Sequence, residues 1–319
     1  MRKLLYKILK FTCFFIPFSV FVMILVASST VVTPALEKIV FTHPTELSVT
    51  YDRIKGLDTW LETEDTGQRG LIIGGSTVYI NINPNLLSSK TGIDFYVAAN
   101  PAQPLLNSVE VLKYCLDNDK KIDYVILSID HFLWDYKNGL VSSTNWLIND
   151  YKPARKHVFN MVANADNNYV WLYYAYVVVK RFLPYTKEYL KINQENIRLE
   201  DKGYACYTTN VARADFKPEF IQRRHLSEPN YNALREAIDL CKWKKIKIIL
   251  FMPKILNSEF DRNELKEIDA TILDATPAPV DAKLYYDNFH MQCDGATIYT
   301  SWLADEFNKI FSGENNKTN

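Results

Sequence analysis

The sequence has no excess of charge of either sign. Lys and Arg together number 37, and so do Asp and Glu, which leaves a formal net charge of zero over 319 residues. A protein without a positive field has no long-range attraction for the phosphate backbone of a nucleic acid. We therefore expect no nucleic-acid partner, and no acidic surplus points to a cationic one.

Cysteine is scarce, and its spacing shows no pairing. The five cysteines are odd in number and lie far apart, at Cys13, Cys115, Cys206, Cys241 and Cys293. Without a CxxC pair, the spacing indicates neither a zinc site nor a redox motif, and it does not suggest a disulfide framework. A single disulfide is possible, but the spacing does not predict which cysteines would form it. Cys115 and Cys241 lie in helical patterns and are expected to be small core residues. We expect no metal site and no cofactor.

Charge is missing altogether between residues 11 and 32, directly after a basic segment at residues 1–10. An uncharged, mostly apolar stretch of this length is long enough to cross a bilayer as a helix. The pattern predicts a cytoplasmic segment at 1–10, a transmembrane signal-anchor at 11–32, and export of the remaining chain. A cleaved signal peptide ending near Ala27 is the alternative. In a bacterium, either interpretation places the main domain in the periplasm or on the outer cell surface.

The sequence after the apolar stretch predicts alternating strands and helices. Apolar runs typical of buried strands lie at residues 71–73, 94–99, 124–129 and 246–252. Helical spacing of apolar residues marks residues 105–116, 233–241 and 294–311, the last with Asp294 as its expected N-cap. Such alternation predicts an α/β domain with a parallel sheet covered by helices on both faces.

Other segments do not follow this alternation. Residues 33–67 are expected to be a linker, and residues 312–319 a polar, frayed tail. Residues from about 135 to 230 are rich in Tyr and Asn and are interpreted as a helical insertion. Within them, the apolar run 169–179 is too short to span a membrane comfortably and is expected to be a buried helix.

Ligands of open parallel sheets bind beyond the carboxyl ends of the strands, so polar residues that follow a strand are the candidates for a site. Three such groups follow strands and a fourth precedes the last helix: Gly74–Thr77, Asn100–Gln103, Asp130–His131 and Asp287–His290. Each of them is also compatible with an ordinary turn or cap. In particular, the Gly-Gly-Ser turn is not the GxSxG elbow of α/β-hydrolases, because Val78 occupies the last glycine position.

Together these groups contain the parts of a serine mechanism. Ser76 is a nucleophile if a base takes its proton. Asp287 lies three residues before His290, so its carboxylate can orient and polarise that imidazole as a general base. The amide of Asn100 can donate to an oxyanion. Gln103, Asp130 and His131 are candidate lining residues of the pocket.

In this order, the four groups resemble the motifs of the SGNH hydrolase superfamily, also called GDSL-like. The closest likeness is to membrane-anchored envelope members, the DltD-like proteins and those of exopolysaccharide O-acetylation. It covers residues 68–132 and 245–311. The resemblance implies a flavodoxin-like three-layer α/β/α sandwich over 68–311. It also implies Ser76 as nucleophile, His290 as base, Asp287 as its orienting carboxylate, and an oxyanion hole at the Ser76 amide and Gly75, with Asn100 as a second donor.

Two departures from the family pattern bear on activity. Gly75 stands where the opening motif often has Asp, and Asp130 stands near the place where the third block usually supplies Asn. An ionised Asp130 would repel an oxyanion, and losing one oxyanion donor costs roughly 10²–10³ in rate. The alternative to an enzyme is thus a degenerate SGNH-like protein that binds or assembles polysaccharide, and an unrelated anchored α/β protein is a third possibility.

The expected function is acyl-group chemistry at the cell envelope. The resemblance implies transfer of an O-acyl group, commonly acetyl, to a surface polysaccharide or lipid-linked glycan, or its removal. The anchor favours transfer, because tethering raises the effective concentration of the domain beside a membrane partner. By analogy with the family, that partner would be a membrane-bound O-acyltransferase that passes acyl groups across the bilayer.

Overall fold

The structure is a computed structural model. It describes residues 2–28, 56–63, 67–117, 121–130, 134, 156–157, 160–161, 197–199, 202–207, 225–258 and 262–315. His131 and the apolar run 169–179 lie outside the described residues.

The centre of the molecule is a five-stranded parallel sheet with the strand order β2-β1-β3-β6-β7. The strands are β1 (Arg69–Gly74), β2 (Asp94–Ala99), β3 (Tyr124–Ser128), β6 (Lys247–Met252) and β7 (Thr271–Asp274). The predicted α/β class with a parallel sheet is confirmed, and so are its first four strands. β7 was not predicted from the sequence.

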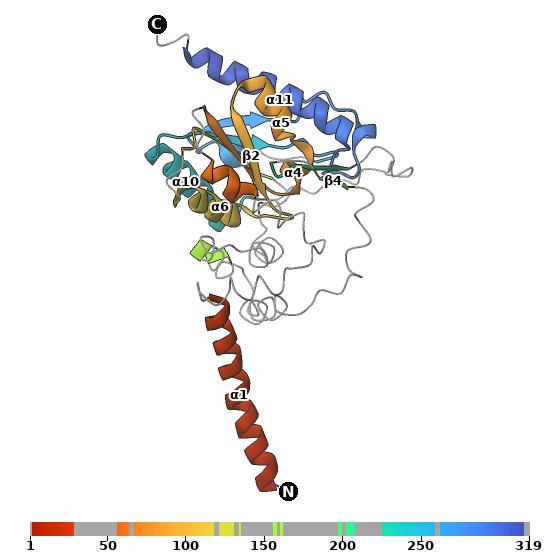
Figure 1. Cartoon of the computed structure of the whole chain (residues 1–319). Helices are drawn as coiled ribbons and strands as arrows, with labels where there is room; N and C mark the ends of the chain where they lie inside the picture. The colour runs from red at the N-terminus through yellow and green to blue at the C-terminus, as the bar shows by residue number, and fades with distance from the viewer. Residues whose placement is uncertain are drawn as a thin grey trace.

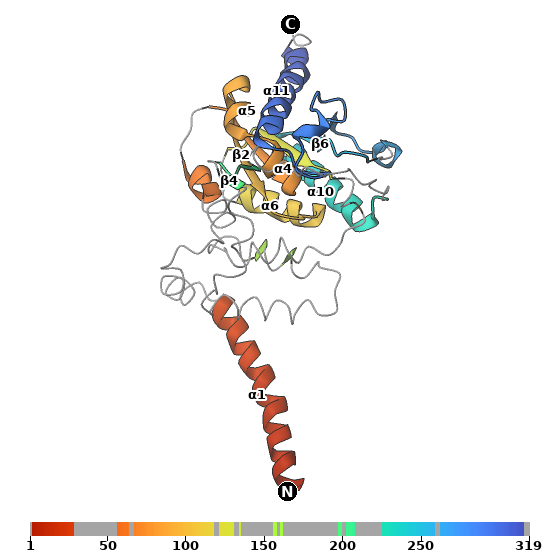
Figure 2. The ribbon, with the colours of Figure 1, turned by 90° about the vertical axis from the view of Figure 1, so that its right-hand side faces the viewer.

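Helices cover both faces of this sheet (Figures 1 and 2). One face carries α6 (Leu105–Asp117) and α10 (Glu228–Trp243), and the other carries α4 (Ser76–Asn81), α5 (Pro84–Thr91) and α11 (Cys293–Asn315). Short 3-10 helices lie at Arg262–Leu265 and Ala282–Leu284. The arrangement has three layers, as predicted, although α4 and α5 were not predicted from the sequence.

Side chains of each strand alternate between two separate cores. On β1, Leu71 and Ile73 belong to the core under α6 and α10, whereas Ile72 belongs to the core under α4, α5 and α11. All three side chains are fully buried. A strand that buries both of its faces reads as an uninterrupted apolar run, which is why the sequence revealed it.

One expectation about the last helix was wrong. α11 begins at Cys293, so Asp294 lies in its first turn and is not its N-cap. The carboxylate there still complements the positive end of the helix dipole. The helix continues to Asn315 and thus includes residues 312–315 of the expected tail, while fraying of that tail stays a prediction.

The insertion is not only helical, contrary to expectation. Among its described residues, β4 (Ile197–Leu199) and β5 (Ala205–Tyr207) form an antiparallel pair. A disulfide joins Cys206 of β5 to Cys293 at the start of α11, a pair that the sequence spacing did not indicate. Cys115 and Cys241 are buried free thiols, as predicted.

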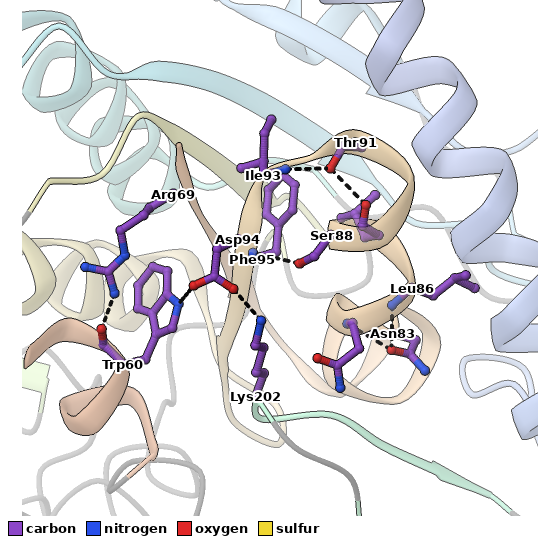
Figure 3. Close-up of polar contacts among 12 residues, drawn as sticks. Trp60, Arg69, Asn83, Leu86, Ser88, Thr91, Ile93, Asp94, Phe95 and Lys202 are labelled. Atoms are coloured by element: carbon purple, nitrogen blue, oxygen red, sulfur yellow. Dashed lines mark hydrogen bonds and ion pairs between the residues drawn. The ribbon is translucent and has the colours of Figure 1, made fainter. Parts of the chain in front are cut away.

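The hairpin formed by β4 and β5 and residues 56–62 of the expected linker meet at the start of β2 (Figure 3). The Asp94 carboxylate accepts a hydrogen bond from the indole of Trp60, which lies in a helical stretch at residues 56–62. The same carboxylate forms an ion pair with Lys202. The backbone carbonyl of Lys202 also accepts from Val97 of β2 at 3.0 Å. The hairpin is therefore fastened to the edge strand of the sheet.

The N-terminal helix α1 spans Arg2–Ser28 (Figure 1). Within the described part of the chain, no helix meets the length and hydropathy expected of a membrane span.

Candidate active site

The nucleophile candidate lies at a crowded strand end. Ser76 is the first residue of α4, and Gly75, with extended backbone (φ −88°), is its N-cap. A Cβ atom on Gly74 would lie 2.5 Å from Cβ of Ser128 and 2.7 Å from a methyl of Val78. Glycine is therefore needed at position 74 for space, because the end of β1 lies against both Ser128 at the end of β3 and Val78 of α4.

The structure brings Ser76, His290 and Asp287 into one hydrogen-bonded chain. Nε2 of His290 lies 2.7 Å from the Oγ of Ser76, and Nδ1 lies 2.8 Å from Oδ2 of Asp287. All three residues are partly exposed. Residues separated by 214 positions are thus within the reach that general-base activation of a serine requires.

The hydrogen bonds fix which ring nitrogen carries the proton. Oδ1 of Asp287 accepts from the backbone N–H groups of Phe289 and His290, each at 2.8 Å. Burial acts to raise the pKa of Asp287, but the bonds from the His290 ring and from these N–H groups outweigh it, so the pKa is lowered. The ionised carboxylate only accepts, and Nδ1 must therefore carry the hydrogen, which leaves the lone pair of Nε2 facing Ser76.

Asn81 holds the two halves of this chain together, a role that sequence reasoning missed. It is the last residue of α4 and is fully buried. Its Nδ2 donates to the carbonyl of Phe289, and its Oδ1 accepts from N–H of Met291, each at 2.8 Å. The side-chain amide of Asn81 thus binds the backbone on both sides of His290 and fixes the position of His290 relative to α4, the helix that carries Ser76.

Asp130 supports the nucleophile turn, Gly74–Thr77, through hydrogen bonds. Its Oδ1 accepts from the hydroxyl of Thr77 at 2.6 Å and from that of Ser128 at 3.1 Å, and N–H of Gly75 also donates to the carboxyl group. Burial raises the pKa of Asp130, although these hydrogen bonds and the proximity of His290 oppose the effect. The N–H of Gly75 is thus directed to Asp130, which corrects its expected place in an oxyanion hole.

The remaining predicted residues do not all gather at the triad. Asn100 is buried next to the nucleophile turn, where its N–H donates to the carbonyl of Gly74 at 3.3 Å. Its Oδ1 has no hydrogen-bond partner among the described residues. Gln103 is buried and donates instead to Ser108 of α6. His131 lies outside the described residues, so its expected place in the pocket stays a prediction.

The hairpin from the insertion contributes an aromatic residue to the site. The ring of Tyr207 stacks on that of Tyr286, with centroids 3.9 Å apart and planes within 4° of parallel. The same ring lies 5.9 Å from the imidazole of His290. No local signal in the insertion identified Tyr207, because its position depends on the disulfide and on a bridge to Gln292.

The described residues contain no group of three or more His, Cys, Asp or Glu side chains that could hold a metal ion. No protein-family model matches the chain, and no curated protein matches its sequence.

Proposed function

We propose that the protein is a serine-dependent acyl-group enzyme of the SGNH type. The observation that carries the proposal is the continuous hydrogen-bonded chain from Ser76 through His290 to Asp287. The strand order of the sheet supports it, because 2-1-3 followed by two further strands is the flavodoxin-like order. Ser76 also follows the first strand, at the carboxyl edge where such sheets bind ligands.

In the proposed mechanism, the Oγ of Ser76 attacks the carbonyl carbon of an acyl ester while Nε2 of His290 takes the serine proton. The imidazolium is stabilised by the ionised Asp287. His290 then returns the proton to the departing alcohol, which leaves the acyl group on Ser76. In the second half, an acceptor hydroxyl or water gives its proton to His290, attacks the acyl-enzyme, and restores the serine hydroxyl.

The negative oxygen of the tetrahedral intermediates needs a donor. Ser76 is the first residue of α4, so its backbone N–H has no acceptor within the helix and is available for this purpose. Asn100 is buried beside the same turn and is the second candidate donor. Donors fixed in place before the reaction stabilise such an intermediate without reorganisation.

The proposal includes a location outside the cytoplasm and a carbohydrate substrate. The disulfide between Cys206 and Cys293 supports the location, because disulfides persist in oxidising compartments. The basic segment at 1–10 and the uncharged stretch at 11–32 are the reason to expect an anchor in the cell membrane. The proposed substrate is an O-acylated, commonly O-acetylated, surface glycan, with a membrane-bound O-acyltransferase as the proposed partner.

The test uses the purified full-length chain, a fluorophosphonate probe that labels activated serines, and para-nitrophenyl acetate as an acyl donor. We expect labelling and turnover in the wild type and neither in Ser76→Ala or His290→Ala. Ser88→Ala is the matched control, because Ser88 lies on α5 away from the triad, and it should be labelled normally. A folded wild type that is neither labelled nor turns over the ester would refute the proposal in favour of a binding protein.

A further inference from the structure

The hairpin β4–β5 forms one side of the candidate site. It is attached at two points: the disulfide of Cys206, the middle residue of β5, joins it to α11, and Lys202, three residues before β5, joins it to β2. β5 also packs against α4, the helix that begins with Ser76. A segment of the insertion is thereby held against both the nucleophile helix and the loop that carries His290.

Two tyrosines stack where this hairpin meets that loop. Tyr207 ends β5, and Tyr286 immediately precedes Asp287, with its N–H donating to the carbonyl of His290 at 2.7 Å. Both rings are partly exposed, as are Ser76 and His290. Among the described residues, neither phenolic hydroxyl has a hydrogen-bond partner. The pair thus offers an aromatic surface with two polar tips beside the proposed base.

The electrostatics of this surface favour a neutral ligand. The pKa of Tyr207 is raised by burial, and further by the nearby phenols of Tyr79 and Tyr286 and by the charge of Asp287. Its hydroxyl therefore stays protonated at working pH and can donate a hydrogen bond. The ionised carboxylate of Asp287 would repel an anion placed against the same ring.

We propose that Tyr207 and Tyr286 form the acceptor subsite of the enzyme and bind a neutral sugar ring that presents a free hydroxyl to His290. The inference rests on the proposed function. A sugar ring has an apolar C–H face that packs on an aromatic ring and hydroxyls at its edge that bond to phenols. Because the ring centroids of Tyr207 and His290 lie 5.9 Å apart, a sugar bound at this surface would be a direct neighbour of the imidazole.

The test measures how the acyl-enzyme chooses between acceptors. The full-length protein is incubated with para-nitrophenyl acetate and an equal mixture of methanol and a methyl glycoside of glucose, galactose or N-acetylglucosamine. Mass spectrometry then gives the ratio of acetylated sugar to methyl acetate. Methanol needs no subsite, so this ratio cancels any change in the rate at which Ser76 is acylated.

We expect Tyr207→Ala and Tyr286→Ala each to lower the sugar-to-methanol ratio at least about fivefold, given the strength of aromatic stacking. Tyr207→Phe retains the ring and should keep most of the preference. Tyr231→Ala, on α10 beyond the opposite face of the sheet, is the matched control and should leave the ratio unchanged. Two alanine variants on different elements keep the test valid if one of them fails to fold.

Three outcomes would overturn the inference. The first is a ratio that both alanine variants leave unchanged, and the second is a labelled wild type that forms methyl acetate but no sugar ester with any glycoside; these two leave the proposed function intact. The third is a folded wild type that fluorophosphonate does not label, which refutes the proposed function and the subsite with it.

Discussion

Removal of the disulfide is the perturbation whose effect follows most directly from the structure. Cys206 and Cys293 are 87 positions apart, and the bridge ties the insertion to the first residue of the last helix. The double variant Cys206→Ala/Cys293→Ala removes this link without leaving an unpaired thiol. Cys13→Ala is the matched control, because that cysteine is exposed and has no disulfide partner.

The expected magnitude comes from the entropy of the unfolded chain. Closing a loop of this length restricts the unfolded ensemble by about 4–5 kcal/mol in the chain-entropy account. For a domain of this size, that corresponds to a decrease of roughly 10–15 °C in the temperature of unfolding. The double variant should also lose preference for a sugar acceptor, since the bridge positions Tyr207.

The assay combines thiol counting with thermal unfolding of the full-length protein. In denaturant without reductant, the wild type should show three reactive thiols, from Cys13, Cys115 and Cys241, and reductant should add the two of the bridge. Reductant should lower the unfolding temperature of the wild type but not that of the double variant. The reasoning would be refuted by five thiols before reduction, or by a double variant that unfolds at the wild-type temperature.

Three further predictions concern the hydrogen bonds around the triad and one buried carboxyl group. Asp287→Asn should slow fluorophosphonate labelling about 10³–10⁴-fold, because the amide oxygen is held by the backbone N–H groups of Phe289 and His290, so its NH2 group faces Nδ1 of His290 and the ring takes the wrong tautomer; a loss below tenfold would count against the triad. Asn81→Leu leaves a buried carbonyl and N–H unpaired, so unfolding experiments should show a loss of about 2–5 kcal/mol, whereas the exposed Asn85→Ala should show little. Burial, more than the nearby charge of Glu62, raises the pKa of Asp58 to about 6, although a hydrogen bond from Tyr114 opposes the shift. The folded state then holds this proton more tightly, and stability falls as pH rises from about 4 through 6. Asp58→Asn should therefore stabilise the protein by about 1–2 kcal/mol near neutral pH and hardly at all near pH 4, and an equal effect at both would contradict this assignment.

The sequence predicted those elements whose burial in the fold leaves a local pattern of apolar residues. β1, β2, β3 and β6 are buried on both faces, so uninterrupted apolar runs predicted them. β7 has two exposed residues among its four and carries no comparable signal. The helix α5 did carry one: Asn83 caps it by accepting from two backbone N–H groups, and Pro84 follows at the first helical position, a recognised start signal.

The triad was predictable because parallel topology brings strand ends and the loop before the last helix to one edge of the sheet. The contacts that hold it were not. Asn81 reaches the backbone of Phe289 and Met291 across more than 200 positions, and a lone Asn at the end of a short helix has no pattern to reveal this. Tyr207 joins the site through the bridge of Cys206, and cysteine spacing alone does not determine connectivity.

From the sequence, the main objection to catalysis is that an ionised Asp130 would repel the oxyanion. In the structure, this carboxyl group instead supports the turn that carries Ser76. Two of its three hydrogen bonds come from Thr77 and from N–H of Gly75, the neighbours of Ser76 on either side, so it holds the nucleophile turn. Burial favours its neutral form, which weakens the expected repulsion of an oxyanion. The Asn donor that the resemblance to SGNH motifs implies is nevertheless missing at this position, and on the proposed mechanism one lost donor slows attack roughly 10²–10³-fold. Such a loss slows attack by water as well, so on the proposed mechanism the acyl-enzyme survives longer. An acceptor sugar already bound at Tyr207 then gains over water by proximity, which favours transfer over hydrolysis.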